Sequence, residues 1–154
     1  MRTRVHNAMK SKLVSKPGET RVWIVVLDMG EEAKTQLVAF ANQEGIANAS
    51  FVALGAFERA TIAYFDWQKK EYQNIPVNEQ VEVITLAGDI VPDDKGKPSL
   101  HAHTVLGRSD GSTRGGHLIE GHVRPTLEVT VTELPAHLRR HKHPELGVAL
   151  IERV

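Results

Sequence analysis

The sequence predicts an α+β fold, with a central and mainly antiparallel β-sheet on which one principal helix packs. Most of its apolar segments are short and rich in β-branched residues, as strands are. Only residues 31–44 repeat apolar side chains at a sustained helical spacing. A chain in which strands dominate and one strong helix appears is typical of a sheet that is covered on one side by that helix.

The helix is predicted from a start signal, an apolar stripe and a stop signal. It follows residues 21–27, a nearly continuous apolar run that predicts a strand buried on both faces. Asp28 can cap the helix, and Glu31 lies three residues further on, as in a variant of the capping box. Gly45 is a typical stop residue. The predicted buried stripe consists of Ala33, Leu37, Phe40 and Ala41.

The other elements are short strands separated by polar turns. Strands are expected at residues 50–56, 60–65, 81–90 and 146–151. Two more strands are expected on either side of a turn at 110–111, and the strand after this turn extends to residue 132. Polar turns are expected at residues 66–70 and 93–98. Residues 136–141 are compatible with a short second helix.

We predict one domain, residues 19–154, behind a basic N-terminal arm, residues 1–18. A length of 154 residues, with 41% hydrophobic and 25% charged residues, is typical of a single globular domain. No apolar run approaches the ~18 residues that a membrane span requires. Because the first residues carry no apolar stretch of the kind found in secretory signals, we expect a cytoplasmic protein without membrane contact.

Composition restricts the kinds of site that the chain can form. It has no cysteine, so any metal ion must be held by His, Asp or Glu. Lys+Arg and Asp+Glu both total 19, and a neutral chain lacks the global positive field that favours nucleic acids. DNA contact would depend on local clusters, such as the lysines of the arm or the candidate phosphate contacts Arg139, Arg140 and Lys142. The alternatives are a solvated tail and a charged surface loop.

A histidine-rich hairpin is the most informative stretch of the chain. His101 and His103 point to the same side of a strand, because side chains alternate between its two faces. A hairpin that is symmetric about Asp110 places His103 directly opposite His117, with His101 on the diagonal. The prediction depends on this register, since a shift by one residue would turn His117 to the other face.

Three imidazoles on one face predict a divalent metal site. They suit Zn²⁺ and leave a fourth position for water or substrate, although nickel, iron or copper accept the same ligands. Gly115 and Gly116 leave room beside His117 for a ligand or another backbone. Asp89 and Glu120 are candidates to orient a ligating imidazole. The alternative is that the three histidines are ordinary strand residues that hydrogen-bond to their neighbours, and that Asp89 and Glu120 are ordinary surface acids.

The stretch that runs from residues 86–90 through 98–103 to 115–121 resembles the PPC domain (plants and prokaryotes conserved). Residues 50–57 and 60–66 fit the same family, and the resemblance covers about residues 20–133. It implies a largely antiparallel α+β fold, a homotrimer and a DNA-binding role. The chain lacks the Arg-Gly-Arg-Pro core of the AT-hook segments that accompany this domain in plants.

The histidine pattern is also similar to the zinc site of acetolactate decarboxylase. That resemblance implies zinc ligation by His101, His103 and His117. Three hypotheses for function follow. In the first, the chain is a DNA-associated homotrimer with a three-His metal site. In the second, it is a metal-dependent enzyme, or a binding protein, for a small carboxylate or carbonyl compound. In the third, the metal ion only stabilises the assembly.

Overall fold

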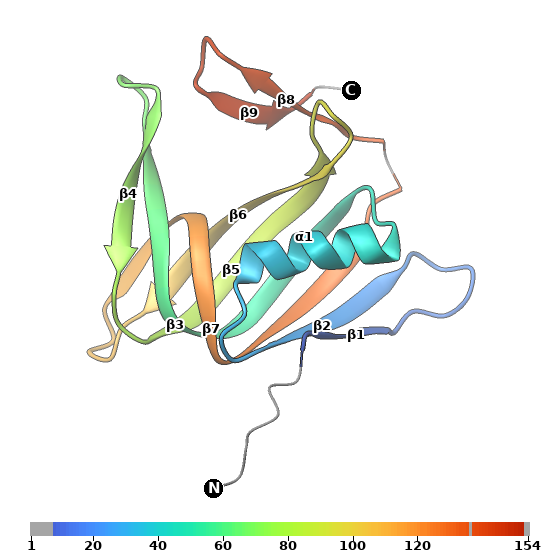
Figure 1. The fold of residues 1–154 in the computed structure, drawn as a ribbon, viewed down its shortest axis with the longest axis horizontal. Helices are drawn as coiled ribbons and strands as arrows, with labels where there is room; N and C mark the ends of the chain where they lie inside the picture. The colour runs from blue at the N-terminus through green and yellow to red at the C-terminus, as the bar shows by residue number, and fades with distance from the viewer. Residues whose placement is uncertain (1–7, 136, 153–154) are drawn as a thin grey trace, which may run out of the picture.

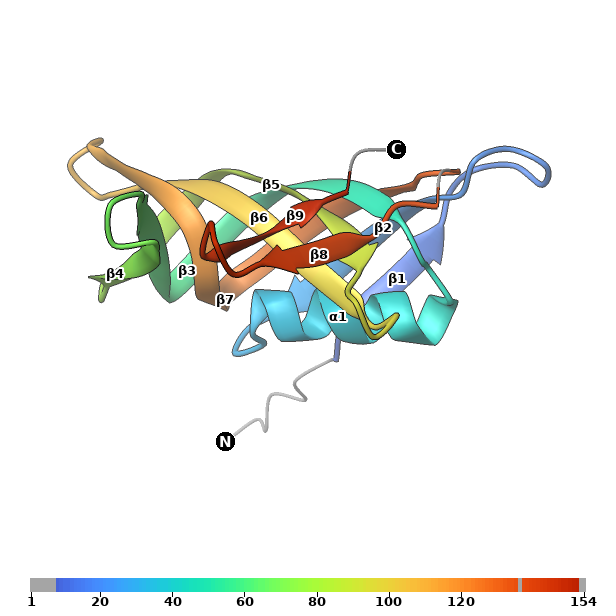
Figure 2. The ribbon, with the colours of Figure 1, turned by 90° about the horizontal axis from the view of Figure 1, so that it is seen from above.

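The computed structural model describes residues 8–135 and 137–152. It shows a curved sheet with one helix on one face and a small hairpin near the C-terminus (Figures 1 and 2). The predicted α+β class, with one principal helix on an antiparallel sheet, is confirmed. The elements are β1 (Lys10–Leu13), β2 (Val22–Asp28), α1 (Ala33–Glu44), β3 (Ala49–Asp66), β4 (Glu71–Val77), β5 (Val81–Pro92), β6 (Pro98–Gly107), β7 (Thr113–Glu133), β8 (Arg140–His143) and β9 (Val148–Ile151).

The main sheet has seven strands in the order β1-β2-β7-β6-β5-β3-β4 among the described residues, and every pairing is antiparallel. β3 also pairs with β7, so β3, β5, β6 and β7 form a closed circuit of pairings. β3 and β7 are 18 and 21 residues long, so each can pair with several other strands along its length. This circuit curls the sheet around its core. β8 and β9 form a separate two-stranded sheet.

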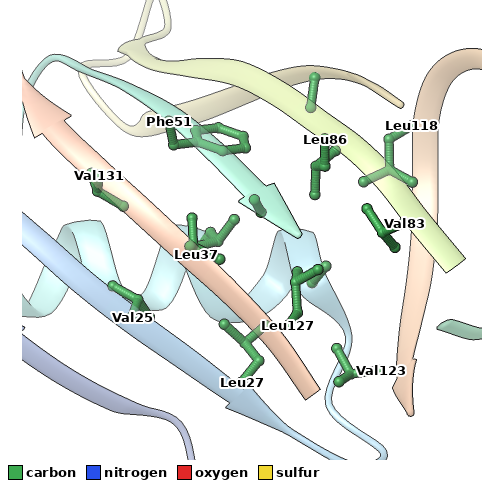
Figure 3. Packing of buried hydrophobic residues seen from close by; sticks show 14 of the residues in the cluster. Val25, Leu27, Leu37, Phe51, Val83, Leu86, Leu118, Val123, Leu127 and Val131 are labelled. Carbon is green, nitrogen blue, oxygen red and sulfur yellow. The ribbon is translucent and has the colours of Figure 1, made fainter. Parts of the chain in front are cut away.

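The core lies between the concave face of the sheet and α1 (Figure 3). The predicted helical stripe is confirmed, because Ala33, Leu37, Phe40 and Ala41 are its buried residues. Phe40 meets the Trp23 ring edge-on, with ring centroids 5.5 Å apart. The prediction that residues 21–27 are buried on both faces was wrong. Alternate residues of β2 are buried, but Ile24 is 36% exposed because no further layer covers the second face.

The helix begins two residues later than the sequence predicted, and its N-cap lies four residues beyond the predicted Asp28. Asp28 cannot cap it, because the Asp28 backbone is still paired with Thr126 of β7. Glu32 is the N-cap, and its carboxylate accepts hydrogen bonds from the amides of Lys34 and Thr35 at 3.1 and 2.8 Å. The C-terminus agrees with the prediction, since Gly45 adopts the left-handed conformation with φ 64°.

Other boundaries differ where long-range pairing outweighs the local pattern. The two strands predicted at 50–56 and 60–65 are one strand, β3, which bends through register shifts near Gly55 and Phe57. A helix at 136–141 was the wrong expectation: residues 137–139 are irregular and β8 begins at Arg140. Part of the predicted arm is an edge strand, β1, and residues 1–7 lie outside the described part. Within the described ranges, no helix has the length and hydrophobicity to cross a bilayer.

Candidate metal centre

The β6–β7 hairpin has the register that the sequence predicted. His103 is directly opposite His117, and the pairing continues to Gly107 and Thr113 at the turn. Ala102 lies between His101 and His103 and belongs to the buried core, so the two imidazoles project from the outer face of the sheet. His101 is opposite Asp89 of β5. Strand alternation on β6 and the pairing of β6 with β7 therefore place the three predicted histidines together.

The three histidines form a group that can hold a metal ion. One ligand nitrogen from each of His101, His103 and His117 lies within 4.8 Å of the other two. The ring centroid of His101 is 5.0 Å from those of both His103 and His117, and these two are 5.6 Å apart. The planes of His103 and His117 are 76° apart, so the rings converge rather than stack. Such a set matches the three-His donor sets that bind zinc.

The protonation and hydrogen bonding of His117 fit a metal ligand. Its Nδ1 is buried and has no hydrogen-bond partner among the described residues, which is costly unless another bond satisfies it. Burial, followed by the nearby His101, lowers the pKa of His117 to about 4. The pKa of His101 is also lowered, first by burial and then by Arg140. Neutral imidazoles with free lone pairs are the form that binds metal ions.

Tyr72 covers the outer side of this group, and sequence reasoning missed it. Its ring stacks on the His117 imidazole with centroids 4.5 Å apart and planes 29° apart. Tyr72 reaches this position because β4 pairs with β3, which sets it opposite Phe65. The same tyrosine lines a cavity of about 390 Å³, whose other walls come from the β8–β9 hairpin: Lys142, His143, Pro144, Gly147, Val148 and Ala149.

A lysine that the sequence did not single out also adjoins the triad. β6 and β7 part beyond the His103–His117 pair, and α1 contacts both strands. In the first turn of α1, Lys34 donates a hydrogen bond of 3.3 Å from Nζ to the backbone carbonyl of Leu118, the residue after His117. Burial lowers the pKa of this lysine.

The predicted basic cluster is divided between the site and the surface. Arg140 is only 6% exposed and its guanidinium bonds to Asp89, the residue opposite His101. Arg140 therefore lies beside the triad, whereas Arg139 and Lys142 are exposed. No local pattern distinguishes Arg140 from its neighbours, because its burial depends on where the hairpin docks.

The remaining predicted residues lie near the triad without bonding to it. Glu120 accepts a hydrogen bond of 3.2 Å from Thr61 and faces His122 at 3.6 Å. The contacts found among the described residues do not join Asp89 or Glu120 to a triad imidazole. A Cβ on Gly116 would lie 2.6 Å from the Ala63 carbonyl oxygen, so this glycine lets β3 approach beside His117. Gly115 is less crowded, at 3.2 Å from the Thr104 carbonyl oxygen.

Comparison with known proteins identifies the family. The model of the Plants and Prokaryotes Conserved (PCC) domain matches residues 14–135. The chain belongs to this family. A PPC protein from Pyrococcus horikoshii is 34% identical with a TM-score of 0.81, and the match covers 91% of this chain and 99% of that one. Among curated protein sequences, none matches this PPC chain.

Two further solved structures bear on function. A protein from Archaeoglobus fulgidus, described as metal-containing, is 30% identical with a TM-score of 0.80, over 96% of this chain and 99% of that one. A "putative" DNA-binding protein from Bacteroides thetaiotaomicron is 29% identical with a TM-score of 0.84, over 95% and 98% of the two chains. A Staphylococcus aureus protein described as similar to acetolactate decarboxylase shares the fold alone, at 13% identity and a TM-score of 0.53 over 79% of this chain and 55% of that one.

Proposed function

We propose that this PPC protein binds one divalent metal ion, zinc, through His101, His103 and His117, and presents its open coordination position to a small carboxylate or carbonyl compound. The observation that carries the proposal is the convergence of three imidazoles on one outer face, with a buried His117 nitrogen that lacks a partner. A relative that is described as metal-containing supports it. We propose a cytoplasmic location for this function.

The site is suited to chemistry as well as to binding. When bound by the three neutral imidazoles of His101, His103 and His117, a zinc ion would keep its positive charge and would supply Lewis-acid chemistry toward a carbonyl or carboxylate oxygen. The chain's own contribution is orientation and shielding. The stacked Tyr72 fixes the His117 ring, and burial keeps His101 and His117 neutral.

Metal analysis of tag-free protein tests the proposal. We expect about one equivalent of zinc per chain in the wild type and less than a tenth of that in His103→Ala. His122→Ala is the matched control, because His122 lies on β7 outside the triad and should keep its metal. Wild-type protein without metal, or equal metal in His103→Ala, would contradict it. A large loss of thermal stability with chelator, without any ligand binding by the loaded protein, would favour a purely structural ion.

DNA association is the second candidate function. The Bacteroides thetaiotaomicron relative is described in those terms, and Lys10, Lys12, Arg139 and Lys142 offer exposed positive charge. Because the net charge of the chain is +0, contact with phosphates would be local and would weaken steeply with salt. Anisotropy titrations with labelled duplex DNA at about 50 and 200 mM salt test this. Absence of binding at the lower salt would exclude it.

We also propose that the protein assembles as the homotrimer that the family resemblance implies. Apolar side chains on the sheet face opposite α1 support self-association. Val52, Leu54 and Ile84 are 57%, 62% and 53% exposed. Val52, Leu54 and Ile24 line a groove of about 390 Å³ whose walls come from β2, β3, β5 and β7. A patch of this kind on an outer sheet face is typical of an interface.

A further inference from the structure

Two cationic side chains flank the histidine triad on different sides. The Lys34 ammonium approaches from α1 and is held 3.3 Å from the carbonyl oxygen of Leu118. Arg140 approaches from β8, and its guanidinium bonds to Asp89 opposite His101. Leu118 directly follows His117 in β7, and Asp89 is paired with His101, so both positive charges lie beside the triad.

These cations have donor capacity that the described residues do not use. Arg140 is 6% exposed, yet its Nε is buried without a hydrogen-bond partner. Lys34 has three donor hydrogens and makes one hydrogen bond among the described residues. The buried Arg140 Nε is costly without an acceptor, and the partly buried Lys34 ammonium has donors to spare, so both groups can serve an acceptor that is not part of the chain.

The acidic groups nearby are already engaged. Asp89 bonds to Arg140. Glu32, the acid that acts on Lys34, accepts hydrogen bonds from the amides of Lys34, Thr35 and Gly121 at the start of α1. With a divalent ion on the triad, the local charge is strongly positive. Such a site favours an anion over a neutral ligand.

We propose that the open position beside the triad binds the carboxylate group of a small organic acid, with one oxygen toward the metal ion and the other hydrogen-bonded to the Lys34 ammonium. Lys34 is then the residue that selects for negative charge, and Arg140 reinforces it from the opposite flank. A planar carboxylate has two oxygens on one carbon, which suits a bridge between two neighbouring positive centres. This inference rests on the proposed metal site.

Cobalt-loaded full-length protein provides a test with an optical readout. Cobalt(II) accepts the same ligands, and its visible absorption changes when an exogenous ligand enters the open position. We expect acetate to change the wild-type spectrum and Lys34→Gln to weaken acetate binding about tenfold, the loss of one charge-assisted hydrogen bond. Lys95→Gln removes the same charge from the exposed turn between β5 and β6 and should match the wild type. Neutral imidazole should bind all three proteins equally.

The outcomes separate this inference from the metal site itself. Absence of a cobalt spectrum in the wild type would contradict the metal site. A cobalt spectrum with equal acetate affinity in wild type and Lys34→Gln would overturn the carboxylate proposal alone. Lys34→Arg keeps the positive charge and should retain most of the acetate affinity. This second variant therefore tests the role of the charge even if Lys34→Gln folds poorly. Binding of inorganic phosphate without binding of acetate would overturn the carboxylate assignment.

Discussion

The Tyr72 ring lies stacked on the imidazole of His117, with centroids 4.5 Å apart. Tyr72 comes from β4 and His117 from β7, so this contact joins the edge of the sheet to the metal site. Tyr72→Ala should weaken metal binding about threefold to tenfold, since the aromatic pair contributes about 0.5–1.5 kcal/mol. Competition with a chromophoric chelator measures the change. Trp67→Ala removes an exposed aromatic from the nearby turn and should leave metal affinity unchanged; equal losses would contradict the role of Tyr72.

Gly116 and Gly115 should differ in their tolerance of a methyl group. A Cβ on Gly116 would lie 2.6 Å from the backbone oxygen of Ala63, and neither strand can move without disturbing the pairing. We expect Gly116→Ala to lower the free energy of unfolding by about 1–3 kcal/mol. Gly115→Ala meets the Thr104 carbonyl oxygen at 3.2 Å and should cost less. Urea unfolding of both variants measures these losses. A larger loss for Gly115→Ala than for Gly116→Ala would contradict the close approach of β3 to Gly116.

The metal-free protein should lose stability as pH falls from about 6.5 toward 4. Burial lowers the pKa of His117 from 6.5 to about 4 and also lowers that of His101. Between the folded and unfolded pKa values the unfolded chain binds more protons, so acid favours unfolding there, while the stability is fully present above about 6.5.

Urea unfolding in the presence of chelator, at several pH values in this window, measures the effect. The double variant His101→Gln/His117→Gln should show a shallower decline than the wild type. Parallel pH profiles for the two proteins would mean that other groups dominate the acid sensitivity.

The Asp89–Arg140 pair should anchor the C-terminal hairpin. Arg140 is 6% exposed, so Asp89→Asn leaves a buried guanidinium without its counter-charge. Breaking a buried pair in this way costs about 3–5 kcal/mol, which we take as an upper bound because Asp89 is 27% exposed. Limited proteolysis after residue 135 should become faster. Glu79→Gln removes the partner of the more exposed Arg108 and should leave the free energy of unfolding nearly unchanged, because solvent screens an exposed pair. Equal effects would argue against anchoring.

Self-association should depend on the exposed apolar face. Leu54 is 62% exposed within one chain, and Leu54→Glu would bury a charge in any interface formed there. We expect a trimer for the wild type and a smaller species for the variant by light scattering after size exclusion. Tyr64→Glu is the control, because Tyr64 is 65% exposed on the same strand but does not line the groove. A wild-type monomer would contradict the proposed assembly.

The sequence alone determined the parts of this protein that follow from short-range periodicity. Strand alternation put His101 and His103 on one face, and a symmetric turn set His103 opposite His117. Both results depend on the parity of neighbouring residues, which the local chain controls. The buried stripe of α1 followed in the same way from helical spacing.

Only the tertiary structure decided what surrounds the three histidines. Tyr72, Lys34 and Arg140 reach the site from β4, α1 and β8, which pairing and packing bring together from distant parts of the chain. The same long-range pairing merged two predicted strands into β3 and held Asp28 in β2, away from the helix cap. Such contacts depend on how whole helices and strands dock, and the local sequence around Tyr72, Lys34 and Arg140 does not predict that docking.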